Sequence, residues 1–287
     1  MKLNYKRTIL IGFAFLSISA FWQMYDGIVP LILKNTFGIG ETVTGAIMAA
    51  DNVFALFLLP LFGTFSDKVN TPFGKRMPFV VIGTLLASAL LIALGYANAA
   101  ENISAFVIIL FFLLIAMGTY RSPAVALMPD LTPKPLRSKG NAIINLMGAV
   151  GGVFTLAMIK VLVGPEDKPN YMPLFTAVVL CMIISVAILV ITIRENKLRA
   201  MMPAEEPETP AEKAGDLDAV VVDEPAKAKR KLPKEVKRSL IFMLCSISLW
   251  FTAYNAVTTA FSRYVNEVWH MEQGGYASCL IRQPTIP

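Results

Sequence analysis

Residues 57–97 read FLLPLFGTFSDKVNTPFGKRMPFVVIGTLLASALLIALGYA: an apolar run, a short charged loop and a second apolar run. The second run, 77–97, has 21 residues and no charge. A helix rises ~1.5 Å per residue, so this length crosses a hydrocarbon layer of ~30 Å. The run is apolar on every face, which excludes an amphipathic surface helix. The stretch therefore predicts two membrane-spanning helices joined by a basic loop.

The rest of the chain repeats this pattern. Of its 287 residues, 55% are hydrophobic and 16% are charged, whereas soluble domains carry ~25% charged residues. The first run lacks a small-x-small cleavage site and is too long for a signal peptide, so we expect it to be retained. We predict an all-α, polytopic membrane protein with seven spans, near residues 8–33, 43–65, 77–97, 104–127, 141–163, 171–193 and 239–262.

The charges are concentrated in one insert between the sixth and seventh spans. Segment 194–238 holds 21 of the 46 charged residues. It is acidic and proline-rich over 203–225 and basic over 227–238, a composition that cannot bury a core and predicts disorder. The basic half either contacts anionic lipid or is a solvated tether beside the membrane.

Lysine and arginine in the short connections predict the orientation. The N-terminus and the loops after the second and fourth spans carry nine, whereas the alternate loops carry only Lys34 and Lys168. Cytoplasmic loops hold the excess of positive charge. We therefore expect an integral plasma membrane protein whose N-terminus and 194–238 connector are cytoplasmic. The net charge of +6 then reports topology, and no nucleic-acid partner is expected.

Groups for catalysis or metal binding are few. The three cysteines, Cys181, Cys245 and Cys279, have no metal-ligand spacing, and His270 is the one histidine. No nucleophile has a histidine base in a readable motif, and no phosphate-binding glycine loop is present. The sequence predicts neither an enzyme nor a metal or cofactor site.

Charged residues inside the predicted spans are the main functional signal. A charge at the centre of a membrane helix costs about 2.5–3.5 kcal/mol on insertion scales. Asp26, Asp51 and Arg121 lie in the first, second and fourth spans, and opposite charges on different helices can pair inside a bundle. Asp51 could instead lie near the outer interface, where water would solvate it.

Polar and aromatic residues accompany these charges. Trp22 lies one turn before Asp26 and Gln23 is three residues from it, so an aromatic face adjoins an amide and a carboxylate. Such a face suits a sugar, although Trp22 could belong to an interfacial aromatic belt. Gly148 and Gly152 lie on one face of the fifth span and predict close helix packing. Further candidate binding residues, each with the alternative of a packing role, are Asn52, Asn145, Tyr254 and Asn255.

Two loops carry a resemblance to a known family. The first has Gly63, Asp67 and Lys68, then Gly74, Lys75 and Arg76 before Pro78-Phe79, and resembles the signature between the second and third helices of the major facilitator superfamily. Its longer spacing is similar to that of sucrose-type and glycoside–pentoside–hexuronide cation symporters. The segment from Arg121 to Asn141, with Asp130 and Arg137, resembles their connection between the fourth and fifth helices.

The resemblance implies two six-helix bundles joined by a cytoplasmic loop. Residues 1–193 would form the first bundle, 194–238 the connector and 239–287 the start of the second. It also implies a gating role for the loop residues Gly63, Asp67, Lys68, Gly74, Lys75, Arg76, Asp130 and Arg137. Carboxylates in the first two helices of the family couple to a proton or sodium ion, which implies this role for Asp26 and Asp51.

We therefore expect a secondary transporter that couples a proton or sodium ion to the symport of a sugar or glycoside by alternating access. The alternatives are an exporter of drugs or lipids from the same superfamily, or a non-functional truncated membrane protein. The apolar segment that begins at Gly274 turns polar at Arg282, too early for an eighth span. This ending suggests a truncated or frame-shifted chain that does not transport by itself.

Overall fold

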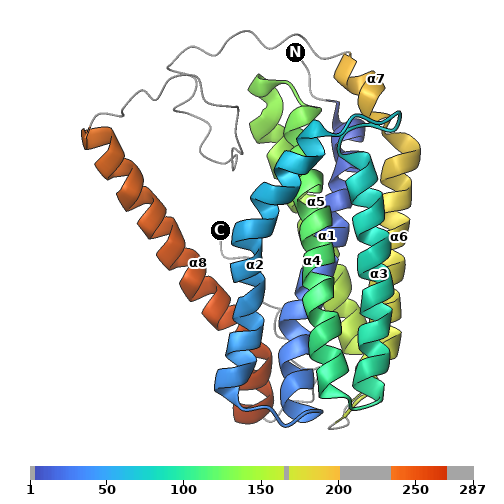
Figure 1. Ribbon diagram of the computed structural model, residues 1–287, viewed down its shortest axis with the longest axis vertical. Helices are drawn as coiled ribbons and strands as arrows, with labels where there is room; N and C mark the ends of the chain where they lie inside the picture. Colours follow the sequence, from blue (N-terminus) through green and yellow to red (C-terminus); the bar gives the residue numbers. More distant parts are fainter. Residues whose placement is uncertain (1–3, 165–167, 201–233, 270–287) are drawn as a thin grey trace.

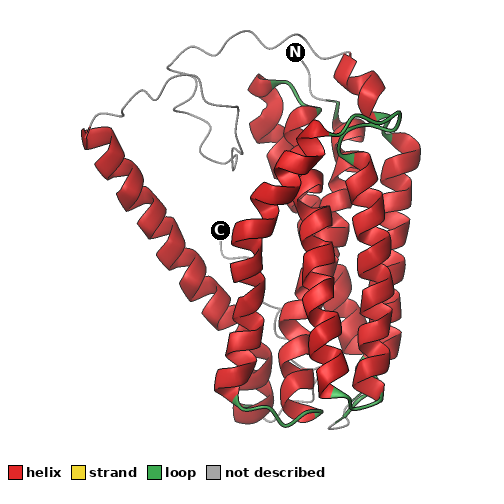
Figure 2. Cartoon of the chain, in the orientation of Figure 1, coloured by secondary structure: helices red, strands yellow, loops and turns green. Residues whose placement is uncertain are grey.

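The structure is a computed structural model that describes residues 4–164, 168–200 and 234–269. Within these ranges the regular structure is helical apart from a single bridge between Thr71 and Gly74 (Figure 2). Seven helices are long and apolar enough to cross a membrane, and they match the seven predicted spans to within a few residues. The elements are α1 (Tyr5–Asn35), α2 (Glu41–Lys68), α3 (Met77–Ala99), α4 (Ile103–Asp130), the 3-10 turn η1 (Lys134–Leu136), α5 (Arg137–Leu162), α6 (Met172–Thr192), α7 (Glu195–Ala200) and α8 (Lys234–Val268).

Local sequence explains where several helices begin. The side chain of Asn4 accepts a hydrogen bond from the backbone N–H of Arg7 at 3.2 Å and so caps α1. Asn102 caps α4 in the same way through the N–H of Ala105, at 3.0 Å. Proline occupies the first turn of α3 and of α6, where its missing N–H costs no intrahelical bond.

Helix α1 lies at the centre of a six-helix bundle, packed mainly against α5 and α6, while α3 packs on α4 and α2 on α4 (Figure 1). The α1–α5 contact depends on glycine, because a Cβ at Gly151 would overlap the carbonyl of Leu16. Gly148 also lies in the contact, as predicted. Gly152 also faces α1, where a Cβ would meet Gln23 at an ordinary contact distance, so the closest approach of the two helices lies one residue earlier, at Gly151.

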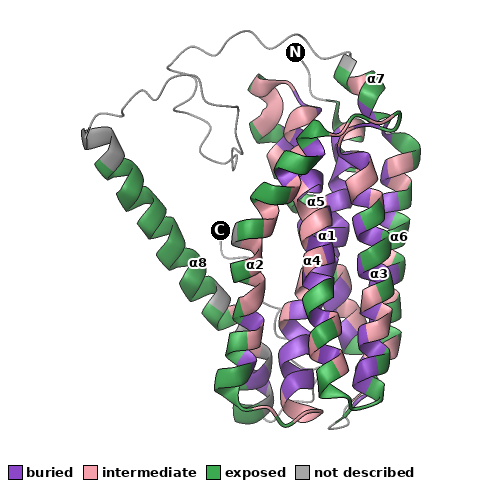
Figure 3. Ribbon diagram, viewed as in Figure 1, coloured by how far each residue is buried: buried purple, intermediate pink, exposed green. Residues whose placement is uncertain are grey.

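Helix α8 meets the bundle only near its C-terminal end. Phe261 packs against the bundle core and Val265 is fully buried, whereas the described side chains over 238–254 are all exposed (Figure 3). In Figure 1 the N-terminal part of α8 diverges from the other helices. The seventh span is therefore attached to the bundle at one end.

Two helical segments extend into the expected connector, 194–238. Residues 195–200 form α7, and α8 already begins at Lys234. Helix α7 lies beside the start of α3, because Glu195 and Asn196 find hydrogen-bond partners there that composition does not reveal. The predicted disorder of 201–233 falls outside the described residues, as do most of the lipid-contact segment 227–238 and the aborted span at 274–287.

Candidate functional site

Three charged side chains from three helices lie close enough inside the spans to interact electrostatically. Asp26 lies on α1, Asp51 on α2 and Arg121 on α4, and all three are half-buried. Both carboxylates act electrostatically on the guanidinium of Arg121, and Asp51 acts on Asp26. The sequence predicted each charge separately, and the structure adds that they form one cluster.

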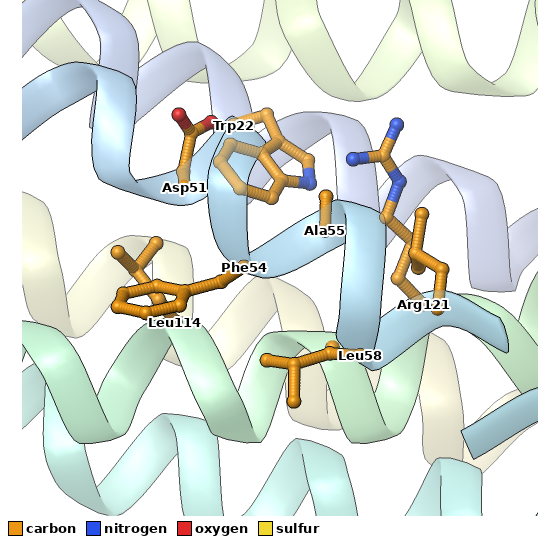
Figure 4. A pocket seen from close by; sticks show the side chains of 9 residues that line it. Trp22, Asp51, Phe54, Ala55, Leu58, Leu114 and Arg121 are labelled. Atoms are coloured by element: carbon orange, nitrogen blue, oxygen red, sulfur yellow. The ribbon is translucent and has the colours of Figure 1, made fainter. Parts of the chain in front are cut away.

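Trp22 connects this cluster to a pocket. The guanidinium of Arg121 lies over the Trp22 ring, 5.3 Å from its centroid, the distance of a cation–π contact. The pocket is lined by Trp22, Asp51, Phe54, Ala55, Leu58, Leu59, Leu114, Gly118 and Arg121. Figure 4 shows the Trp22 ring between the Asp51 carboxylate and the Arg121 guanidinium, with Phe54, Leu58 and Leu114 opposite. The pocket thus has one charged, aromatic side and one apolar side.

Two hydrogen-bonding groups in this region have no protein partner among the described residues. The indole Nε1 of Trp22 and the hydroxyl of Tyr25 are both buried and unpaired. Tyr25 is 1% exposed, and the carboxylates of Asp51 and Asp26 act electrostatically on its hydroxyl. Buried polar groups are rarely left without a partner, so these two atoms are available to a bound solute or ion. Tyr25 was not among the site residues predicted from the sequence.

The other predicted site residues have different surroundings. The amide of Asn52 donates to Asp51 at 2.8 Å, and the Gln23 amide lies close to Gly152 on α5. Asn145 is exposed on α5, and Tyr254 is exposed on α8, where it stacks on Trp250 with ring centroids 5.7 Å apart. The backbone of Asn255 lies in α8, and its side chain is outside the described part. The structure therefore does not bring Asn145 and Tyr254 to the cluster.

A second cluster lies at the bundle end that holds the loop between α2 and α3. The side chain of Arg76 is 7% exposed and forms ion pairs with Asp67 at 2.5 Å and with Asp130 at 3.0 Å. Its Nη1 also donates to the carbonyl of Gly63 at 3.3 Å and to the hydroxyl of Ser66. We call these groups the Arg76 network. It ties the start of α3 to the ends of α2 and α4.

The remaining loop residues take other places at this end. Gly74 has a φ of +129°, which favours glycine, and is buried. Lys68 and Lys75 form no ion pair with another described residue, although the backbone N–H of Lys75 binds Glu195. Arg137 donates to the carbonyl of Thr132 at 3.3 Å. The sequence missed Ser66 and Glu195, whose partners lie 10 and about 120 residues away.

Two ion pairs fasten α8 at the opposite end of the bundle. Lys34 of α1 pairs with Glu267, and Glu41 of α2 pairs with Arg263. Arg263 and Glu267 are four residues apart and so share a face of α8. We call these the α8 ion pairs. The i, i+4 spacing of Arg263 and Glu267 can be seen in the sequence, but their partners on α1 and α2 cannot.

Together these features define a multi-pass membrane protein with interacting charges inside its spans and ion pairs at both ends. Comparison with known proteins gives the family: the Major Facilitator Superfamily profile matches residues 11–281, and the chain belongs to that superfamily. The resemblance inferred from the two loops is confirmed. Membership in a family of transporters agrees with the prediction that the chain is not an enzyme.

Individual relatives are more distant. A sucrose transport protein of Arabidopsis thaliana, SUC3, is 29% identical over 138 residues, which cover 42% of this chain and 23% of that protein. A putative tartrate transporter of Agrobacterium vitis is 31% identical over 164 residues, 53% of this chain and 36% of that protein. The chain thus spans about a quarter to a third of the curated relatives it matches.

The crystal structure of the POT family transporter PepTSo has the same fold. It superposes with a TM-score of 0.52 at 15% identity, covering 99% of this chain and 56% of that one. The identity is too low to transfer a substrate, so the likeness concerns the arrangement of helices alone.

Proposed function

We propose that the chain supplies the first bundle, the connector and the seventh helix of a cation-coupled symporter of a sugar or glycoside. The observation that carries this proposal is the cluster of Asp26, Asp51 and Arg121 beside Trp22. Three charges inside membrane spans are costly to insert, and such residues mark substrate and ion pathways. The bundle would comprise 1–193 and the second bundle would start at 239.

The charge balance of the cluster favours coupling to a cation. Two carboxylates act electrostatically on one guanidinium, so the cluster carries one net negative charge when all three groups are ionised. Binding one proton or one sodium ion would neutralise it in an environment of low dielectric. Asp26 and Asp51 are the proposed cation-binding groups. Arg121 is the proposed counter-charge, which lowers the free-energy cost of the two carboxylates when no cation is bound.

The other side of the site suits a sugar. The Trp22 ring lines the pocket and would stack on a pyranose, and its unpaired Nε1 would donate to a sugar hydroxyl. The similarity to sucrose transport proteins supports this class of substrate. An exporter of drugs or lipids would use a more apolar site, so these polar groups count against it.

A second candidate substrate is a hydroxylated carboxylate. Arg121 lines the pocket, and a guanidinium binds a carboxylate through two parallel hydrogen bonds. With one carboxylate of the cluster protonated, the substrate's own carboxylate would supply a second negative charge beside Arg121. The similarity to putative tartrate transporters supports this reading.

The ends of the bundle suit alternating access. The α8 ion pairs close one end, while α8 diverges from the bundle toward the end with the Arg76 network (Figure 1). We propose that the Arg76 end is cytoplasmic in the plasma membrane, because the basic loops lie there. The loop between α2 and α3 would act as the gating element on that side, with Asp67, Lys68, Lys75, Arg76, Asp130 and Arg137.

The proposal is tested by ligand binding to the 287-residue chain in nanodiscs, by titration calorimetry with sucrose and with tartrate. We expect sucrose to bind more tightly when the proton or sodium concentration is raised. Trp22→Ala should remove most of this binding, whereas Trp250→Ala, on the exposed part of α8, is the matched control. Preference for tartrate, lost on Arg121→Gln, would favour the second candidate. Binding of neither ligand would refute both.

A further inference from the structure

Glu195 caps a helix that lies about 120 residues before it in the sequence. It follows α6 by three residues and is 1% exposed. Its carboxylate accepts backbone N–H bonds from Lys75 at 2.8 Å, Arg76 at 3.0 Å and Met77 at 3.1 Å. These donors open the first turn of α3, where backbone N–H groups lack intrahelical partners and the helix dipole favours an anion.

The loop before α3 is shaped to admit this carboxylate. A Cβ at Gly74 would overlap the Glu195 side chain. Asn196, the next residue along α7, donates from its amide nitrogen to the carbonyls of Thr71 and Pro72, both at 2.9 Å. Two consecutive residues of α7 therefore hold the loop at both of its ends. In Figure 1, α7 lies at the same end of the bundle as this loop.

Glu195 is connected to the Arg76 network through the backbone of Arg76. Glu195 binds the N–H of Arg76, while the side chain of Arg76 binds Asp67 on α2 and Asp130 on α4. No contact joins Glu195 directly to Asp67 or Asp130 in the described structure. Glu195 therefore fixes the backbone position of Arg76, and the Arg76 side chain joins the start of α3 to α2 and α4.

We propose that Glu195 and Asn196 form a latch through which α7 positions Arg76 in the gating loop. The inference rests on the gating role in the proposed function. A displacement of α7 would withdraw both side chains from the loop. The first turn of α3 would then lose its cap, and Arg76 would no longer be held where it pairs with Asp67 and Asp130.

Hydrogen–deuterium exchange on the full chain in nanodiscs tests the cap. Glu195→Ala should speed exchange of the amides at 75–77 by roughly tenfold or more, since each bond is to a charged acceptor. Glu195→Gln, which keeps one acceptor oxygen, should give a smaller increase, and Asn196→Ala should speed exchange of the loop. Glu101→Ala, an exposed glutamate that pairs with Lys168, is the matched control. Unchanged exchange at 75–77 in Glu195→Ala would overturn the latch.

A second readout separates positioning from general loosening. Ser66 is fully buried against Arg76, so a cysteine there, with Cys181, Cys245 and Cys279 replaced, reports whether Arg76 has moved. We expect Glu195→Ala to increase thiol labelling at position 66 severalfold while amide exchange in the α1–α5 contact stays as in the parent. Equal loosening of both regions, or no change in labelling, would overturn the positioning role. Neither readout uses a substrate, so a failure of sugar binding would refute the proposed function and leave the latch standing.

Discussion

Replacing Gly74 with alanine tests how closely the Glu195 carboxylate approaches the loop. The backbone φ of +129° costs an alanine about 1–3 kcal/mol, and the added methyl group would overlap the carboxylate. Displacing Glu195 weakens three hydrogen bonds from backbone N–H groups. Because water can replace part of them, the loss in the free energy of unfolding should be close to that of one hydrogen bond to a charged group, about 1.5–3 kcal/mol. The expected total loss is about 2.5–6 kcal/mol in the free energy of unfolding.

The assay is unfolding of the purified chain in mixed detergent, with Gly38→Ala as the matched control. Gly38 also has a positive φ, +64°, but nothing lies within 4 Å of its added Cβ, so it should cost only about 1–2 kcal/mol. In a Glu195→Ala background the overlap with the carboxylate is gone and only the Cβ of residue 195 stays too close, so Gly74→Ala should cost less than in the parent chain. Equal losses for Gly74→Ala in both backgrounds would refute the close approach.

Three further perturbations address other contacts. Arg76→Lys should lower stability by about 2–4 kcal/mol in the same assay, because one ammonium cannot serve Asp67, Asp130 and the Gly63 carbonyl together; a loss below 0.5 kcal/mol would contradict the network. Cysteines at Lys34 and Glu267 should cross-link readily in membranes, whereas a cysteine pair at Lys34 and Leu244 should not; equal yields would contradict the attachment of α8 at one end. Gly151→Val should destabilise by about 2–4 kcal/mol through overlap with the Leu16 carbonyl, and a neutral result would refute the close α1–α5 packing.

The helices could be predicted from the sequence because the membrane imposes one simple requirement on each. A run such as 77–97 needs only length and apolarity to span, and both are local properties. The helix that follows α6 at Glu195 escaped prediction, because its stability comes from a loop 120 residues away. Composition assigned the residue to a disordered insert, and only the fold brings its partners to it.

The candidate site was predictable in part for the same reason. Asp26, Asp51 and Arg121 stand out because a charge in a span is costly wherever it lies, and this cost identifies residues without identifying contacts. Which of them meet depends on how α1, α2 and α4 pack. Asn145 and Tyr254 have equally suitable side chains, but they occupy exposed faces of α5 and α8. Tyr25 became a candidate only when its hydroxyl was seen to be buried without a partner.

The central claim is that the carboxylates on α1 and α2 bind a cation that promotes solute binding. The most direct measurement is the affinity of the chain for sucrose in nanodiscs, as a function of pH and sodium concentration, before and after Asp26→Asn and Asp51→Asn. We predict a cation dependence in the parent chain that either substitution abolishes, while Asp67→Asn, in the Arg76 network, retains it. A cation dependence that survives both substitutions would contradict the claim.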